Sequence, residues 1–185
     1  MLTSNIKKFL EANIELIEAN RFDELYEKAE TDLYFSQGIG TLTRTLLKAD
    51  IDPLPHLTEI PYCYLYGDPN IIEFVIPDNI EFVNSCAFCN CSQLHDVIFG
   101  KDVSVIYYGA FENCTELTNV TLNDGLLEIG QYAFRNTNIE KLMIPATVRS
   151  IDIQALPEVI TLEVLPGTYA HDWAVTNGYD VEMVY

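Results

Sequence analysis

A cluster of cysteines near the middle of the chain contains the first side chains whose types and spacing suggest chemistry. It has the form Cys86-x-x-Cys89-x-Cys91, and His95 follows it closely. Thiolates and imidazoles are zinc ligands, and paired thiols also support redox chemistry. Zinc sites usually pair two C-x-x-C knuckles, or one knuckle with two histidines, and this segment supplies one knuckle. We therefore interpret these cysteines as structural and expect no cofactor, with a metal site and redox chemistry as open alternatives.

Nucleophilic catalysis requires a base beside a serine, cysteine or lysine. The histidines, His56, His95 and His171, are far apart in the sequence, and no pattern pairs any of them with a nucleophile. The chain also lacks G-x-S-x-G, P-loop and G-x-G-x-x-G motifs. The sequence therefore predicts a protein that is not an enzyme.

The charge of the chain limits the partners it can bind. There are 28 acidic and 10 basic residues, which give a formal net charge of −18. The acidic excess extends along the whole chain, which argues against direct nucleic-acid binding because phosphate contacts need Lys and Arg. Two interpretations stay open: a charge that only keeps the protein soluble, and attraction to a partner with a basic surface.

The sequence also carries signals of location. No stretch approaches the ~20 apolar residues that span a bilayer, and acidic residues interrupt the apolar ones at the N-terminus, unlike a secretory signal. The cysteine count, 5, is odd, so reduced thiols are expected. We therefore expect a cytoplasmic protein that does not contact membranes.

A repeat of about 22–23 residues organises the second part of the chain. Ala-Phe pairs begin at Ala87, Ala110 and Ala133, and a weaker copy begins at Ala155. Apolar columns keep the same spacing: Phe74, Val97, Val120 and Leu142; Ile76, Phe99, Leu122 and Ile144; Ile80, Val103, Leu126 and Val148; Val83, Ile106, Ile129 and Ile151. Such a period indicates stacked coils, each of which contacts only its neighbours.

Each unit reads L-x-x-V-x-I-P-x-x-I-x-x-V-x-x-x-A-F-x-x-C. The V-x-I segment alternates as a short strand with one buried face does. Pro77, Gly100 and Pro145 then turn the chain. The Phe fills the coil interior, where its burial contributes about 1.5–3 kcal/mol. Cys91 falls in the same small-residue column as Cys114, so Cys86 and Cys89 are the cysteines of the cluster that the repeat does not explain.

This pattern resembles the BspA-like leucine-rich repeat family. The best match is "LTNVTLNDGLLEIGQYAFRN", which begins at Leu117, and the ending "VLPGTYAHDWAVTNGYDVEMV" is similar to the usual terminus of the family, a short helix and a last strand. The resemblance implies a β-rich solenoid used for binding, without shared catalytic residues. Members occur on bacterial and protist surfaces, and short cytoplasmic ones occur in phages and mobile elements; this chain is most similar to the short type.

The fold class predicted on this basis is α+β: a β-rich leucine-rich-repeat solenoid of about four coils with an N-terminal helical module. Residues 1–70 form the helical module and N-terminal cap, and residues 71–185 form the solenoid with its C-terminal cap. Helices are predicted over 4–20, from 21 or 22 to 30, and over 39–49. In the first helix we expect one apolar face, made by Ile6, Leu10, Ile14 and Ile17.

Exposed positions of the repeat are the candidate binding residues. An outward strand column comprises Val75, Ile98, Thr121 and Met143. Phe82 and Val105 lie on the neighbouring wall, and Tyr107 and Tyr108 lie on the turn that follows this wall. The acidic residues beside these positions are Glu73, Glu81, Asp96 and Glu128. An apolar stripe rimmed by carboxylates is typical of a protein-binding face. The alternative is that flat strands favour β-forming residues whatever they bind, and that the acids form only a solvated surface.

These observations favour a non-catalytic protein-binding module that presents a rigid acidic repeat surface to a protein partner. A second hypothesis is a phage-encoded inhibitor of a host defence or nucleic-acid enzyme, in which periodic carboxylates imitate a phosphate backbone as in an anti-CRISPR protein. A third and weaker one is a metal protein that uses the cysteine cluster. The sequence names neither the partner nor the oligomeric state.

Overall fold

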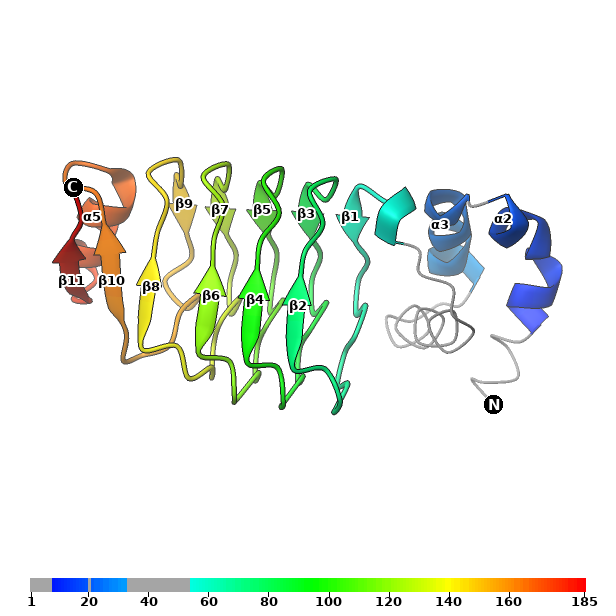
Figure 1. Ribbon diagram of the computed structural model, residues 1–185, viewed down its shortest axis with the longest axis horizontal. Helices are drawn as coiled ribbons and strands as arrows, with labels where there is room; N and C mark the ends of the chain where they lie inside the picture. The colour runs from blue at the N-terminus through cyan, green and yellow to red at the C-terminus, as the bar shows by residue number, and fades with distance from the viewer. Residues whose placement is uncertain (1–7, 20, 33–53) are drawn as a thin grey trace.

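The computed structural model describes residues 8–19, 21–32 and 54–185. Short parallel strands stack along one axis to form a solenoid, with helices α2 and α3 beyond its N-terminal end and helix α5 at its C-terminal end (Figure 1). Among the described residues, no helix is both long and apolar enough to cross a bilayer.

One wall of the solenoid is a five-stranded parallel sheet, here called sheet A, in the order β1-β3-β5-β7-β9. The Ile or Val that ends each strand points into the core, and these residues pair in register from Ile60 through Val83, Ile106 and Ile129 to Ile151. The strands are β1 (Glu59–Ile60), β3 (Phe82–Val83), β5 (Val105–Ile106), β7 (Glu128–Ile129) and β9 (Ser150–Ile151).

The second wall, sheet B, consists of two three-stranded parallel sheets, β2-β4-β6 and β11-β10-β8. Its strands are β2 (Glu73–Val75), β4 (Asp96–Ile98), β6 (Asn119–Thr121), β8 (Lys141–Met143), β10 (Thr161–Val164) and β11 (Asp180–Met183). The break between β6 and β8 follows the point where the repeat shortens from 23 to 22 residues, between Thr137 and Ile139. β8 lies alongside β6 without a strand pairing, whereas sheet A stays paired across the same step.

The phenylalanines of the Ala-Phe pairs form a stack inside the coils. The Phe111 ring lies parallel to Phe88, at 5.0 Å between centroids, and parallel to Phe134, at 5.3 Å. All three side chains have no exposed surface. Because each ring contacts the rings of adjacent coils, the core is continuous along the solenoid while every contact stays between neighbours.

The turns that follow the strands of sheet A contain asparagines with positive φ at equivalent positions of successive coils. Asn90, Asn113 and Asn136 have φ of 63°, 60° and 57°. Asn136 donates from Nδ2 to Asn113 Oδ1 (2.8 Å), and Asn113 donates in the same way to Asn90 (3.1 Å). Asparagine tolerates the left-handed conformation better than most residues do. The same side chain therefore fits the turn and links it to the next coil.

Gly100 occupies a turn where two coils approach closely. A Cβ at this position would lie 2.4 Å from the Pro77 carbonyl oxygen and 2.6 Å from that of Ile76. Backbone atoms cannot yield as a flexible side chain does, so a glycine is required here.

The N-terminal helices have a small core of their own. Residues 8–12 are helical, and α2 (Ile14–Glu18) and α3 (Phe22–Asp32) follow. This core also contains Leu57, next to the short 3-10 helix η1 (Leu54–His56) that leads into the solenoid. Its buried residues are Phe9, Leu16, Phe22, Leu25, Ala29 and Leu57.

The apolar face predicted for the first helix is present in part: Leu10 and Ile17 pack against the helical core, whereas Ile14 does not face it. Ile14 is 52% exposed, whereas Phe9 and Leu16 are buried. The helix is interrupted at Asn13, whose side chain is buried, donates to the Phe9 carbonyl (2.8 Å) and accepts from Lys28 Nζ (2.8 Å). This interruption changes which residues face the core. Ile6 and the helix predicted over 39–49 lie outside the described residues.

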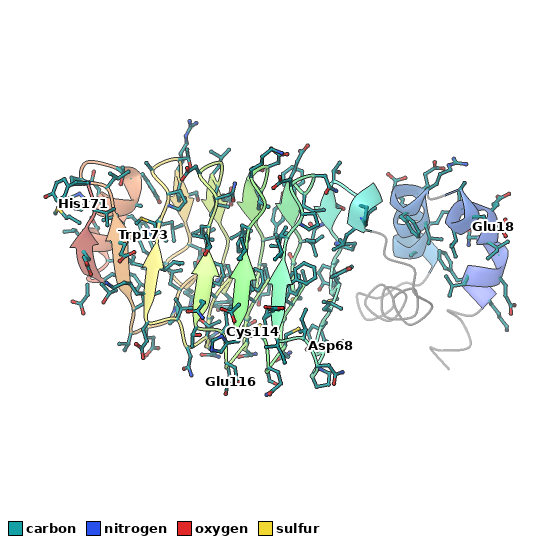
Figure 2. All side chains as sticks on the ribbon, viewed as in Figure 1. Glu18, Asp68, Cys114, Glu116, His171 and Trp173 are labelled. Carbon is teal, nitrogen blue, oxygen red and sulfur yellow. The ribbon has the colours of Figure 1, made fainter. Side chains whose placement is uncertain are left out.

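The C-terminal end of the solenoid is covered by α5 (Tyr169–Thr176) and β11. Thr168 caps the helix by accepting a hydrogen bond from the His171 backbone N–H. Trp173 stacks on Tyr179 at 5.2 Å. Figure 2 shows His171 and Trp173 at this end and Glu18 on the helical part at the other. The helix and last strand implied by the family resemblance are therefore present.

The predicted fold class is confirmed: a β-solenoid of leucine-rich-repeat type with a short N-terminal helical part. It has about five turns, compared with the predicted four. The difference comes from β1, which lies within residues 1–70, the predicted cap. This strand pairs with β3 in the register of the later repeats, so the residues that close the N-terminal end are themselves a partial coil.

Candidate protein-binding surface

The outer face of sheet B carries the predicted apolar column. Val75, Ile98 and Thr121 are paired across β2, β4 and β6, so their side chains are neighbours on one face. Val75 is 64% exposed and Ile98 49%. Met143, on β8 in the next coil, is 43% exposed. Paired strands lie about 4.8 Å apart, so Val75, Ile98 and Thr121 span roughly 10 Å, and Met143 extends the stripe into the next coil.

A polar column runs beside this stripe. Glu73, Asp96 and Asn119 are paired across β2, β4 and β6. Asp96 accepts a hydrogen bond from Asn119 Nδ2 (2.7 Å) and lies 2.8 Å from His95 Nδ1. Hydrogen bonds from His95 and from Asn119 hold the pKa of Asp96 below its usual value. The carboxylate at the middle of the stripe is thus fixed in position and charged at neutral pH.

Ion pairs close the C-terminal end of the stripe. Met143 is paired with Glu163 on β10, and Glu163 is paired with Glu182 on β11. Lys141 Nζ lies 3.2 Å from Glu163 and 2.6 Å from Glu182. Hydrogen bonds to Glu182 and Glu163 raise the pKa of Lys141. The apolar stripe therefore ends at an ion-paired group of one lysine and two carboxylates.

The remaining predicted residues lie on the other wall. Phe82, Val105 and Glu128 are paired across β3, β5 and β7 on the outer face of sheet A, and exposed Glu81 precedes β3. Tyr107 packs beside Phe82, with 6.3 Å between ring centroids, and Tyr108 contacts the Tyr132 ring at 5.4 Å. Sequence reasoning selected one set of candidates, and the structure divides it between two surfaces.

A groove of about 440 Å³ lies next to the break in sheet B. It lies between the loops that precede β8 and β10, with Thr118, which precedes β6, also in its lining. Its lining comprises Thr118, Asn136, Thr137, Asn138, Ile139, Glu140, Pro157, Glu158 and Val159. Sequence reasoning did not select these residues, although the change in repeat length marked their position.

The repeat cysteines are part of the core. Cys91 and Cys114 are buried, and their thiols donate to the carbonyls of Leu65 (3.0 Å) and Phe88 (3.1 Å) in the preceding coil. Burial raises the pKa of Cys114. Both thiols act as hydrogen-bond donors within the core, which agrees with the structural interpretation of this column.

His95 does not join the cysteines. Besides its contact with Asp96, its Nε2 lies 3.1 Å from Thr118 Oγ1. Within the described ranges, no group of three or more His, Cys, Asp or Glu is arranged to hold a metal ion.

The structure instead brings Cys63 to the cluster. The Cys86 side chain is hydrogen-bonded to Cys63 and Cys89, and these three thiols are called the thiol cluster below. Sequence reasoning assigned Cys63 to the cap and missed this contact. The signal was present, because Cys63 precedes Cys86 by the 23 residues of the repeat.

Stacked coils with a short strand, an Ala-Phe pair and a small closing residue define a leucine-rich-repeat solenoid. The family model described as "BspA type Leucine rich repeat region (6 copies)" matches residues 57–165. The chain belongs to this BspA-type leucine-rich repeat family. The match begins just before β1, in agreement with the partial coil there. Proteins of this repeat type are typically non-catalytic. No curated protein matches the chain.

The solved structures that are similar to this chain include two leucine-rich repeat proteins. The first, a leucine-rich repeat protein from Bacteroides ovatus ATCC 8483, is 28% identical with a TM-score of 0.55, and the match covers 60% of this chain and 29% of that one. The second, a leucine-rich cell surface protein from Faecalibacterium prausnitzii A2-165, is 20% identical with a TM-score of 0.50, over 64% and 33%. The second supports the fold alone. This chain spans about a third of the length of these proteins.

Proposed function

We propose that this protein binds a protein partner through the outer face of sheet B. The observation that carries the proposal is a column of exposed side chains on four successive coils. Three of them, Val75, Ile98 and Met143, are apolar, and Thr121 lies between Ile98 and Met143. Transferring such side chains from water to an interface is favourable by about 25 cal/mol per Å² of apolar area. The rigid strands already hold them in place, so little conformational entropy is lost on binding.

The polar column selects the partner. Glu73 and Asp96 lie on one side of the stripe, and Asp96 is held by His95 and Asn119. Charges at the rim of an interface contribute to specificity and association rate more than to affinity. The proposed partner therefore has an apolar ridge with Lys or Arg beside it.

The test compares substitutions on and off the stripe. Ile98→Asp and Met143→Asp place a charge at the centre of the proposed interface. Ile153→Asp is the matched control, because Ile153 is 64% exposed but lies outside both strand columns. Partners captured from a host lysate by the unmodified protein are quantified for each variant. We expect recovery to fall at least tenfold for the two stripe variants and to change less than twofold for the control. Equal recovery by all three variants would rule out this face.

A second candidate is an inhibitor of a nucleic-acid enzyme that acts through the acidic surface, in the cytoplasm of a host. The specific observation is that Arg21, Lys101, Arg135 and Lys141 already lie within ion-pair distance of carboxylates. With 28 acids and 10 bases in the chain, this pairing leaves a surface whose unpaired charges are mainly negative. Such a surface would bind where a basic groove normally holds nucleic acid.

A further inference from the structure

The thiol cluster joins two adjacent coils at the N-terminal end of the solenoid. Cys63 lies on the turn after β1, and Cys86 and Cys89 lie on the corresponding turn after β3. The Cys86 side chain is hydrogen-bonded to both other thiols and to Tyr62. No disulfide joins any of the three cysteines in this structure. Three thiols at one point are more than the repeat requires, since its own cysteine column continues through Cys91.

Cys63 and Cys86 occupy equivalent positions in successive coils. Ile60 and Val83, three residues before them, are paired in register, and the Leu65 N–H donates to the Ala87 carbonyl (2.7 Å) two residues after Cys63. Both cysteines have positive φ, 54° and 57°. Their Cα atoms are therefore separated by about one coil spacing, roughly 4.8 Å, which lies within the 4.4–6.8 Å that a disulfide spans.

Cys86 is the member of the cluster that solvent reaches. Cys63 and Cys89 are each 5% exposed, whereas Cys86 is half-buried. The equivalent position of the next coil is Gly109, and a Cβ there would lie 3.7 Å from Cys86 Sγ. The glycine therefore leaves the sulfur without a side chain over it on that side.

The surroundings of Cys86 also favour its thiolate. Hydrogen bonds from Cys63, Cys89 and Tyr62 lower the pKa of Cys86, against an opposing effect of burial. The hydrogen bond with Cys86 and burial raise the pKa of Cys89. The thiolate is the reactive form of cysteine, so Cys86 is the expected nucleophile of the three.

We propose that Cys86 and Cys63 form a reversible disulfide with a small-molecule disulfide as oxidant, and so fasten the first partial coil to the first complete one. The Cys86 thiolate attacks one sulfur of the oxidant, whose S–S bond breaks and releases one thiolate. Cys63 then loses its proton and attacks Cys86 Sγ in the mixed disulfide, which releases the second thiolate. The two cysteines give up two electrons and two protons, and the oxidant becomes two thiols.

The proposed bond strengthens the end of the solenoid that carries the helices. Residues 54–65 connect the helical core, through Leu57, to the coil stack, through Ile60. Unfolding of this partial coil moves Cys63 away from Cys86 and would be opposed by the bond. We expect the oxidised protein to unfold at a temperature roughly 5 °C higher than the reduced protein.

The test uses the full chain and oxidised glutathione. Chymotrypsin cuts after aromatic residues, and Phe74, Phe82 and Phe88 separate Cys63, Cys86 and Cys89 into different peptides. After oxidation, unreacted thiols are blocked, and the digest is analysed by mass spectrometry without reduction. We expect a peptide pair linked through Cys63 and Cys86, which disappears on reduction. A link between Cys86 and Cys89, or no link within the chain, would overturn the proposal.

Two variants and an internal control complete the test. After oxidation, Cys89→Ser should still form a disulfide through Cys86, and Cys63→Ser should form no disulfide within the chain, although the two substituted side chains are equally buried. A disulfide within the Cys63→Ser chain would overturn the assignment.

At pH 6, iodoacetamide should label Cys86 in the reduced protein at least tenfold faster than Cys114, because the lowered pKa keeps the Cys86 thiolate present at that pH. Equal rates would contradict Cys86 as the nucleophile. The labelling, and the peptide analysis of the oxidised unsubstituted chain, do not depend on the folding of a variant.

Discussion

Asn90, Asn113 and Asn136 show how one side chain meets two requirements of the repeat. Each adopts the left-handed conformation that its turn needs, and consecutive members are joined by side-chain hydrogen bonds. Asn113 occupies the centre of this ladder and both donates to and accepts from its neighbours. Substitutions there can separate the cost of the backbone conformation from that of the hydrogen bonds.

We expect Asn113→Ala to lower the free energy of unfolding by about 2 kcal/mol and Asn113→Gly by about 1 kcal/mol. Both variants lose the two hydrogen bonds, which contribute roughly 0.5–1.5 kcal/mol each when well protected and less at a half-exposed site. Only alanine also has to adopt a positive φ with a Cβ. Urea denaturation measures both values. If the two variants are equally stable, the backbone conformation carries no cost and this explanation fails.

The sequence contained part of this residue-level information. The columns of Ala, Phe and core Ile or Val were predictable, because burial restricts each position to a similar volume in every coil. The asparagine ladder and the pairing of Cys63 with Cys86 were not predicted. Both depend on turn conformation, which hydrophobic periodicity does not report, although the 23-residue spacing of these residues was present.

At the level of elements, the stacked phenylalanines join each coil to both of its neighbours, in addition to the backbone hydrogen bonds between coils. The strands of sheet A contain two residues each, so they form few ladder hydrogen bonds. Phe111 contacts Phe88 and Phe134 face to face and Phe99 edge to face at 5.7 Å. Loss of this ring removes contacts with the coils on both sides.

We expect Phe111→Ala to destabilise the protein by about 3–5 kcal/mol, the usual cost of removing a buried phenylalanine. Phe82→Ala is the matched control, because Phe82 is half-buried on the outer face of sheet A and contacts Tyr107. We expect the control to cost about 1 kcal/mol. Urea unfolding followed by circular dichroism checks both. A cost below about 1 kcal/mol for Phe111→Ala would show that the stack does not hold the coils together.

Strands were predictable from the sequence where the repeat is regular, and strands and helices were less predictable where the pattern is irregular. The strands of the central coils followed from the alternating V-x-I pattern. The partial coil at β1 was missed because Tyr64 and Leu65 replace the Ala-Phe pair there. The break between β6 and β8 accompanies a loop one residue shorter, and the interruption of the first helix depends on buried hydrogen bonds of Asn13. These details are set by tertiary contacts.

At the scale of the whole molecule, the apolar stripe and the net charge act on a partner over different distances. The apolar stripe acts only on contact, whereas the net charge of −18 acts over the screening length, about 8 Å at physiological ionic strength. The two candidate functions therefore differ in what drives binding. The predicted binding residues were recognisable as outward-facing repeat positions, but their division between two walls became visible only in the folded solenoid.

Salt dependence separates these two modes of binding. If the stripe on sheet B is the interface, we expect the dissociation constant for the captured partner to change less than tenfold between 50 and 500 mM NaCl, because apolar burial is not screened. An acidic surface that imitates nucleic acid would instead lose affinity by orders of magnitude over this range. Surface plasmon resonance with the partner immobilised measures the dissociation constant at each salt concentration.

The Ile98→Asp variant serves as the internal comparison. It adds negative charge, so it should weaken binding through the stripe and leave charge-driven binding equal or stronger. A steep loss with salt, together with unweakened binding by Ile98→Asp, would replace the first proposal with the second.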